Sequence, residues 1–346
     1  MITATPKARQ TSAWQRELAA AITDPRELLE QLGLPASLVE GADPVSAAFP
    51  LRVPRGFVRR MRRGDPADPL LRQVLPLAVE ARAVPGYVAD PLREADARRA
   101  PGLLHKYRGR ALLVATGACA VHCRYCFRRE FPYAEQVGHL GRWREALLQV
   151  SADASIRELI LSGGDPLSLG DERLAQLTGE LAGIPHLETL RIHTRQPVVL
   201  PERVDAGLLG WLRHLPWRTV VVLHVNHPNE LDGSVYDALA GLRDAGATLL
   251  NQSVLLAGVN DDASVLAALS RRLHRAGVLP YYLHLPDAVA GTAHFDVPES
   301  RGRELIADLA RELPGYLVPR LVREVPGRDA KTTIAAGLGA APEAIV

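Results

Sequence analysis

From about residue 105 onward, short apolar runs alternate with longer amphipathic stretches, and this alternation restricts the chain to few folds. The runs predicted to be strands are 111–116, 158–162, 188–193, 219–225, 247–254 and 279–285. Helical periodicity is found over 140–152, 171–183, 201–214, 232–245, 261–277 and 299–313. A strand followed by a helix, six times over, predicts an α/β fold of parallel strands with crossover helices. The spacing fits an open doubly wound sheet or an incomplete barrel, and does not choose between them.

Both folds place functional residues at the C-terminal ends of the strands. Polar and glycine clusters follow positions 116, 162, 193, 225 and 285, which are the ends of predicted strands. The chain before these strands has a different character. Residues 12–33 have helical periodicity, whereas 34–104 are rich in proline and arginine and predict short helices with irregular connections.

The charge balance argues against several partners. The net charge is only +2, which gives no case for nucleic acid or an anionic membrane surface. No apolar run approaches the roughly 18 residues of a membrane span, and the N-terminus lacks the apolar segment of a secretory signal. We therefore expect a cytoplasmic protein that contacts neither nucleic acid nor membrane.

The three cysteines of the chain lie within eight residues, as Cys119, Cys123 and Cys126. This C-x3-C-x2-C loop directly follows the first predicted strand, and thiolates favour iron–sulfur clusters, zinc or copper(I). Three cysteines on a four-iron cluster leave one iron open to a small molecule. A structural zinc ion is usually bound by four protein ligands. His122 could be the fourth, but its position between two of the cysteines makes simultaneous binding to one ion difficult. Three merely buried cysteines are the remaining alternative.

Lysine is almost absent: of 41 basic residues only Lys7, Lys106 and Lys331 are lysines. Arginine cannot supply a deprotonated amine, so a chain that uses arginine elsewhere retains lysine where such chemistry is needed. Lys331 lies in the late segment PGRDAKT, which contains a glycine.

These features resemble those of radical S-adenosylmethionine enzymes, and the string ACAVHCRYCFRREFPY is similar to their lysine 2,3-aminomutase branch. Further similar strings are GDPADPLLRQVLP, PGLLHKYRGRALL, LSGGDPL, RIHTRQPVVLP, VNHPNE, LLNQSVLL and PYYLHLPD. The resemblance covers about residues 50–332. It implies a partial (βα)6 barrel over 105–325, a mainly helical N-terminal extension over 1–104, and a C-terminal segment over 326–346.

The resemblance also implies the cofactors, which are a [4Fe–4S] cluster, S-adenosylmethionine and pyridoxal phosphate. Cys119, Cys123 and Cys126 would hold the cluster, and Lys331 would be the catalytic lysine that carries pyridoxal phosphate. The phosphate group would contact Lys106, Tyr107 and Arg110. The residues expected to bind S-adenosylmethionine are Gly163, Gly164, Asp165, His224 and Gln252, with Arg195 and Asn226 as weaker candidates.

The substrate implied by the resemblance is free L-lysine. Arg128 matches the arginine that pairs with the carboxylate of the amino acid, and its planar fork suits that task. Asp287 matches one of two aspartates that hold the ε-ammonium group. Glu324 stands where the second aspartate is expected; this departure keeps the charge but moves the carboxylate by one methylene group.

Within the branch, the sequence motifs most resemble those of the enzymes whose product, (R)-β-lysine, is attached to elongation factor P by a separate ligase. The chain has no cysteine beyond Cys126, so we expect no zinc site of the kind that longer aminomutases carry. An electron donor of flavodoxin or ferredoxin type is implied as well. Two alternatives stay open, namely an aminomutase of lysine catabolism and a non-catalytic iron–sulfur redox or binding protein.

Overall fold

The computed structural model describes residues 11–136 and 142–336. Within these residues a single sheet of ten strands is hydrogen-bonded in chain order. The strands are β1 (Arg98–Ala100), β2 (Leu103–Tyr107), β3 (Arg110–Thr116), β4 (Glu158–Gly163), β5 (Thr189–Thr194), β6 (Arg218–Leu223), β7 (Thr248–Val254), β8 (Leu279–His284), β9 (Arg320–Arg323) and β10 (Thr332–Thr333).

Strands β3 to β9 are parallel, and each pairs with the next along the chain. A doubly wound sheet would reverse its strand order at a switch point, and this sheet does not. The partial barrel is therefore confirmed. Strand β9 is a further parallel strand that the sequence pattern missed. Antiparallel strands border both edges, with β1 and β2 beside β3, and β10 beside β9.

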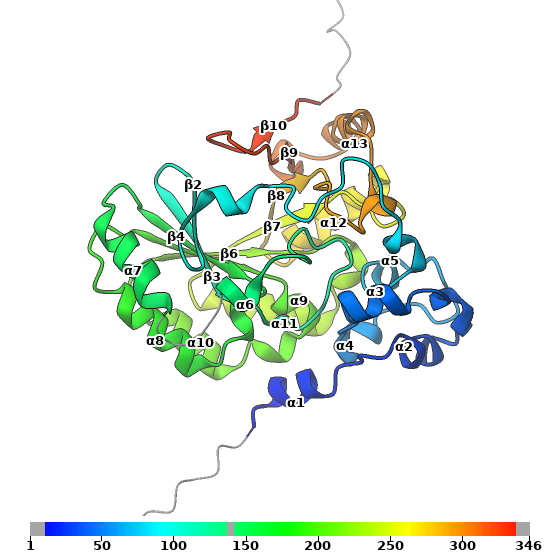
Figure 1. Ribbon diagram of the computed structural model, residues 1–346, viewed down its shortest axis with the longest axis horizontal. Coiled ribbons are helices and arrows are strands. Elements are labelled where there is room, and N and C mark those ends of the chain that lie inside the picture. The colour runs from blue at the N-terminus through cyan, green and yellow to red at the C-terminus, as the bar shows by residue number, and fades with distance from the viewer. Residues whose placement is uncertain (1–10, 137–141, 337–346) are drawn as a thin grey trace, which may run out of the picture.

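The six helices predicted between and after the strands are all present, as α7, α8, α10, α11, α12 and α13. The helices are α1 (Ala13–Ala19), α2 (Pro25–Leu32), α3 (Asp43–Ala48), α4 (Arg55–Val58), α5 (Pro69–Arg72), α6 (Tyr133–Gln136), α7 (Arg142–Ala152), α8 (Asp171–Leu181), α9 (Gln196–Val199), α10 (Ala206–Arg213), α11 (Gly233–Asp244), α12 (Ala263–Arg275) and α13 (Glu299–Glu312). Figure 1 shows α7, α8, α10 and α11 along one side of the sheet. No helix of the described residues is long and apolar enough to cross a bilayer.

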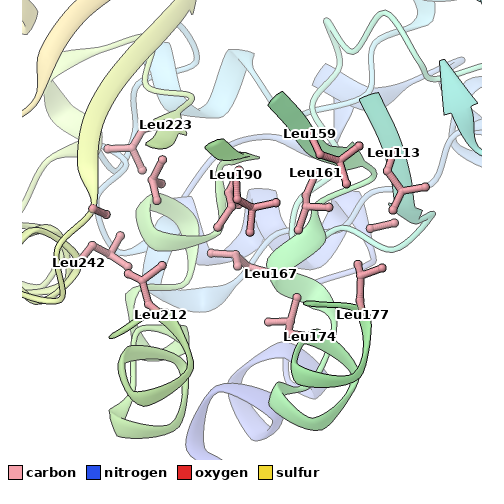
Figure 2. Packing of buried hydrophobic residues seen from close by; sticks show 14 of the residues in the cluster. Leu113, Leu159, Leu161, Leu167, Leu174, Leu177, Leu190, Leu212, Leu223 and Leu242 are labelled. Atoms are coloured by element: carbon pink, nitrogen blue, oxygen red, sulfur yellow. The ribbon is translucent and has the colours of Figure 1, made fainter. Parts of the chain in front are cut away.

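The main core lies between the strands and these helices. Leu161 and Leu190 of the strands meet Leu174 and Leu177 of α8 there (Figure 2). Strand β5 shows how this packing orients the site. Its residues Leu190 and Ile192 belong to the core, so Arg191 and His193 project from the opposite face of the strand. That opposite face is the interior of the partial barrel.

The continuous helical periodicity expected over 12–33 is interrupted in the structure. Helix α1 ends at Ala19, and Ile22 forms an antiparallel bridge with Val53 before α2 begins at Pro25. The reason is local. Proline restricts Asp24 to an extended conformation and suits the first position of a helix, and the Asp24 side chain caps α2 by accepting from the Arg26 amide.

The N-terminal region packs against the cysteine loop. Its apolar cluster, which includes Phe57 and Leu71, also contains Ala120 and Val121 from the loop. Figure 1 shows α2 to α5 grouped beside the parallel sheet. The expected boundary at 104/105 falls inside β2, and the division into three parts stays a prediction.

Candidate active site

The cysteine loop leaves β3 and leads to α6, at the C-terminal end of the parallel strands. Cys119, Cys123 and Cys126 are free and half-buried. Burial raises the pKa of Cys119, and the charges of Asp165, Cys126 and Cys123 raise it further, which places the three thiols within electrostatic range of one another. Three soft donors on one loop fit the expected cluster.

Zinc fits the loop less well. His122 turns toward the N-terminal region, where its Nδ1 lies 2.8 Å from the Pro50 carbonyl oxygen and its ring stacks on Phe49. Among the described residues, no three His, Cys, Asp or Glu side chains are grouped closely enough to hold one metal ion. A cubane cluster makes a different demand, because each cysteine binds a different iron and the sulfurs need not share one centre.

Two glycines at the end of β4 let the cysteine loop pass close to the sheet. The Gly163 backbone has φ +123°, and an added Cβ would lie closer than 3.0 Å to the Thr116 carbonyl oxygen. An added Cβ at Gly164 would lie equally close to the backbone of Gly117 and Ala118. Both positions therefore require glycine for packing, whether or not they also contact S-adenosylmethionine, a role that stays a prediction.

Replacing Gly164 with alanine is expected to destabilise the fold by about 1–3 kcal/mol, because overpacking against backbone cannot be relieved by a side-chain rotation. Gly179, on the exposed face of α8 with open space around it, is the matched control. Gly179→Ala should leave stability unchanged or raise it by up to about 1 kcal/mol. Denaturant unfolding of both variants measures the difference, and equal stability of the two would contradict the packing role.

The Asp165 side chain forms its hydrogen bonds with other residues of the chain. It is buried, and its carboxylate accepts hydrogen bonds from the Thr194 hydroxyl and from the amides of Leu167, Arg195 and Gln196. These bonds tie the end of β4 to the end of β5. The structure thus gives Asp165 a bracing role, and its expected contact with S-adenosylmethionine stays a prediction.

His224 and Gln252 are brought together at the ends of β6 and β7. The Gln252 amide nitrogen lies 2.8 Å from His224 Nε2. Burial, with the positive charges of Arg195 and Arg128, lowers the pKa of His224 to about 3. His224 is therefore neutral at physiological pH and acts here as a hydrogen-bonding group.

Glu324 lies between two of the three lysines. It follows β9, and its carboxylate pairs with Lys331 Nζ at 2.5 Å and with Lys106 Nζ at 2.9 Å. Burial alone would raise the pKa of Glu324, but the charges of Lys331 and Lys106 outweigh it and hold that pKa well below its usual range. Tyr107 and Arg110 adjoin this group, with the Arg110 guanidinium 4.6 Å from the centre of the Tyr107 ring.

Asp287, after β8, is the second carboxylate of this group. Burial raises its pKa to about 7, and the nearby charge of Glu324 contributes in the same direction. Lys331 and Lys106 act the other way without cancelling the effect. The expected pair of carboxylates is therefore brought together beside Lys331.

Arg128 differs from the expectation that its fork is free for a substrate carboxylate. Its Nε and Nη2 donate to the two carboxylate oxygens of Glu94 at 2.7 and 2.8 Å, and its Nη1 donates to Ser162 Oγ at 3.1 Å. Glu94 also contacts Lys106 Nζ at 3.2 Å. One buried glutamate thus contacts both cations, and the role of Arg128 toward the substrate stays a prediction.

Sequence reasoning missed Glu94, His193 and His284. The Nε2 atoms of both histidines are buried without a hydrogen-bond partner among the described residues. Burial lowers the pKa of His284 to about 3, with the charge of Lys331 acting in the same direction. Unpartnered polar atoms beside a lysine fit a pocket for a polar ring such as pyridoxal phosphate. His193 in β5 and His284 in β8 each follow a buried apolar residue, and this alternation was the sequence signal that could have indicated them.

Comparison with known proteins identifies the family. The chain is 48% identical to L-lysine 2,3-aminomutase of Escherichia coli over 323 residues, covering 93% of this chain and 94% of that one. It is 46% identical to the Haemophilus influenzae enzyme of the same name, over 95% and 98% of the two chains. The Clostridium subterminale enzyme of that name is 35% identical, over 93% of this chain and 77% of its own.

No family model matches the chain. Among solved structures, a radical SAM methyltransferase from Sphaerobacter thermophilus aligns with 64% of this chain and 68% of its own, at 16% identity and a TM-score of 0.45. The likeness to three enzymes of one name, over at least 93% of this chain in each case, together with the cysteine loop and the late lysine, settles the membership. The chain belongs to the L-lysine 2,3-aminomutase family, isomerases of the radical S-adenosylmethionine superfamily that use a [4Fe–4S] cluster, S-adenosylmethionine and pyridoxal phosphate.

Proposed function

We propose that this protein converts free L-lysine to (R)-β-lysine, and that the product is destined for elongation factor P. One observation carries the proposal. The cysteine loop and the Lys331–Glu324–Asp287 group lie at the same end of one parallel sheet. Glu94 connects them, because it bonds Arg128, two residues after Cys126, and also Lys106, which pairs with Glu324. An iron–sulfur electron carrier needs neither a half-buried lysine nor two carboxylates beside it.

We assign the residues as the resemblance implies, and this arrangement supports the assignment. Cys119, Cys123 and Cys126 hold the cluster, and Lys331 holds pyridoxal phosphate. When bound, the cluster and S-adenosylmethionine supply a radical that removes a hydrogen atom, and pyridoxal phosphate supplies the group that carries the migrating amine. The chain's own residues bind lysine, orient it and exclude water from it.

Charge explains how the site selects lysine. Glu324 is ionised, and Asp287 becomes ionised when an ammonium group takes a place beside it. The ε-ammonium of lysine satisfies both carboxylates, whereas an acidic side chain such as that of glutamate would be repelled by them. Neutral His193 and His284 line the same interior without adding positive charge that would oppose the ammonium group.

Lysine binding is expected to depend on pH through Asp287. Below its pKa of about 7 the carboxyl group is protonated and cannot pair with an ammonium ion, so the KM for lysine should rise as the pH falls. Between about pH 8 and about pH 6 we expect a change on the order of tenfold, following the ionised fraction. The groups that face Asp287 and set this pKa are Glu324, Lys331, Lys106 and Glu94.

Steady-state kinetics across this pH range check the prediction with two variants. Asp287→Asn should raise the KM for lysine at pH 8 and remove the pH dependence, with little effect on the affinity for S-adenosylmethionine. Asp244→Asn, an exposed aspartate on α11 paired with Arg243, is the matched control and should behave as the parent. A pH profile retained in Asp287→Asn would show that another group titrates.

The function itself is tested by an anaerobic assay of the reconstituted protein. It contains L-lysine, S-adenosylmethionine, pyridoxal phosphate and a strong reductant, with chiral chromatography and mass spectrometry of the amino acids. Formation of (R)-β-lysine is the expected result. Cleavage of S-adenosylmethionine with lysine unchanged would overturn the substrate assignment and leave the cluster assignment standing.

The destination of the product needs its own experiment, in the organism that makes the protein. We propose that a separate ligase attaches the product to elongation factor P and that a flavodoxin or ferredoxin supplies the electron. Deleting the gene should leave elongation factor P lighter by the mass of one lysyl group, and added (R)-β-lysine should restore that mass. An unchanged mass in the deletion strain would favour the alternative of a free β-lysine pathway.

A further inference from the structure

A buried arginine contacts one of the cluster cysteines from outside the cysteine loop. Arg195, directly after β5, is 5% exposed, and its Nη1 donates to Cys123 Sγ at 2.8 Å. The guanidinium also lies over the rings of Phe57 and Tyr125, 5.4 and 5.6 Å from their centres. This contact is independent of the residues that the proposed reaction assigns to lysine or to pyridoxal phosphate.

The guanidinium is fixed in place by a second set of bonds. Arg195 Nη2 donates to Gln73 Oε1 at 2.7 Å and to Glu230 Oε2 at 2.9 Å. Gln73 in turn donates to Glu230 Oε1 at 3.2 Å and accepts from the Asn226 amide at 3.0 Å. Gln73 and Glu230 are fully buried, and their bonds to Nη2 hold the guanidinium with Nη1 directed at the sulfur.

We propose that Arg195 is a positioning residue that tunes the reduction potential of the cluster through its hydrogen bond to the Cys123 sulfur, and that Gln73 of the N-terminal region holds it there. The inference rests on the proposed function, because it requires Cys123 to be a cluster ligand. A donor on a ligating sulfur stabilises the reduced cluster, which carries one more negative charge, more than the oxidised one. The N–H group therefore makes the cluster easier to reduce.

The test is a redox titration of the anaerobically reconstituted protein, followed by the electron paramagnetic resonance signal of the reduced cluster. Iron and sulfide are quantified in each sample. Arg195→Gln should shift the midpoint to a more negative potential. We expect the ratio of reduced to oxidised cluster, at the midpoint of the parent protein, to fall about tenfold, which corresponds to ~59 mV for one electron.

Arg203 provides the matched control. It is also fully buried, pairs with Asp171, donates to the Leu167 carbonyl and lies over the Trp14 ring, so its replacement removes an equally buried guanidinium. Arg203→Gln should lower stability without moving the midpoint potential. Gln73→Met keeps Arg195 and its bond to Glu230 but removes one of the two acceptors that hold Nη2, and should move the midpoint in the same direction as Arg195→Gln by a smaller amount.

The outcomes separate this inference from the proposed function. A cluster of full iron content with an unshifted midpoint in Arg195→Gln would overturn the role of Arg195 and leave the proposed function intact. An equal shift in Arg203→Gln would overturn it too, by showing a general effect of destabilisation. Absence of any cluster in the parent protein would instead overturn the proposed function.

Discussion

The Cys123→Ala protein is expected to lose S-adenosylmethionine cleavage completely, because removing one of three thiolates leaves a cubane cluster with only two protein ligands. Iron content after reconstitution should fall with the activity. Both are measured on the same sample, by iron analysis and by chromatography of 5′-deoxyadenosine formed under a strong reductant. Cleavage retained at the parent rate would show that Cys123 is not a cluster ligand.

His122→Ala is the control for this experiment. His122 lies in the same loop, one residue before Cys123, but its side chain is turned to Pro50 and Phe49. We expect the variant to keep its iron and its cleavage activity, with only the modest instability of a lost hydrogen bond. A loss of metal equal to that of Cys123→Ala would make His122 a ligand and revive the zinc alternative.

The second large effect is expected for Lys331→Ala. Lysine to β-lysine conversion should fall by at least about a thousandfold, since no other residue takes over a nucleophilic amine. The variant should still cleave S-adenosylmethionine, because Lys331 lies outside the cysteine loop. Borohydride reduction followed by peptide mass spectrometry locates the pyridoxyl group, which we expect on the peptide that contains Lys331 in the parent and on none in the variant.

Lys106→Arg is the matched change. It keeps the positive charge that Glu94 and Glu324 now contact but removes the other half-buried amine of the site. The pyridoxyl group should still be found on Lys331, and activity should be lowered less than tenfold. A label on Lys106 in the parent would reverse the two assignments.

Most of the parallel sheet could be predicted from sequence, because its strands are short apolar runs with helices of clear periodicity between them. Strand β9 was missed since its four residues, Arg320–Arg323, place a charge at either end and only two buried residues between them. The hairpin of β1 and β2 was missed for a similar reason: β1 reads Arg-Arg-Ala, and only pairing with β2 makes it a strand.

The site residues that could be predicted are those recognisable from a short stretch of sequence or from their rarity. Three cysteines within eight residues and a rare lysine are visible without any fold. The partners that depend on folding were not. Glu94 precedes Arg128 by 34 residues and neutralises it only because η3 (Glu94–Ala97) folds over the cysteine loop. Nothing in the sequence around Glu94 indicates this bond.

The cysteine loop is held in shape by bonds that need no metal. The His122 and Arg124 amides donate to the carbonyls of Arg52 and Gln73, and the Arg124 guanidinium forms a buried ion pair with Glu80 of η2 (Ala78–Ala81). These bonds anchor the residues on either side of Cys123, so we expect them to help hold the loop in place whether or not the cluster is bound. A protein built this way is expected to survive the oxidative loss of its iron with its fold preserved, so that repair after exposure to air requires new iron and sulfide but no new synthesis of the chain.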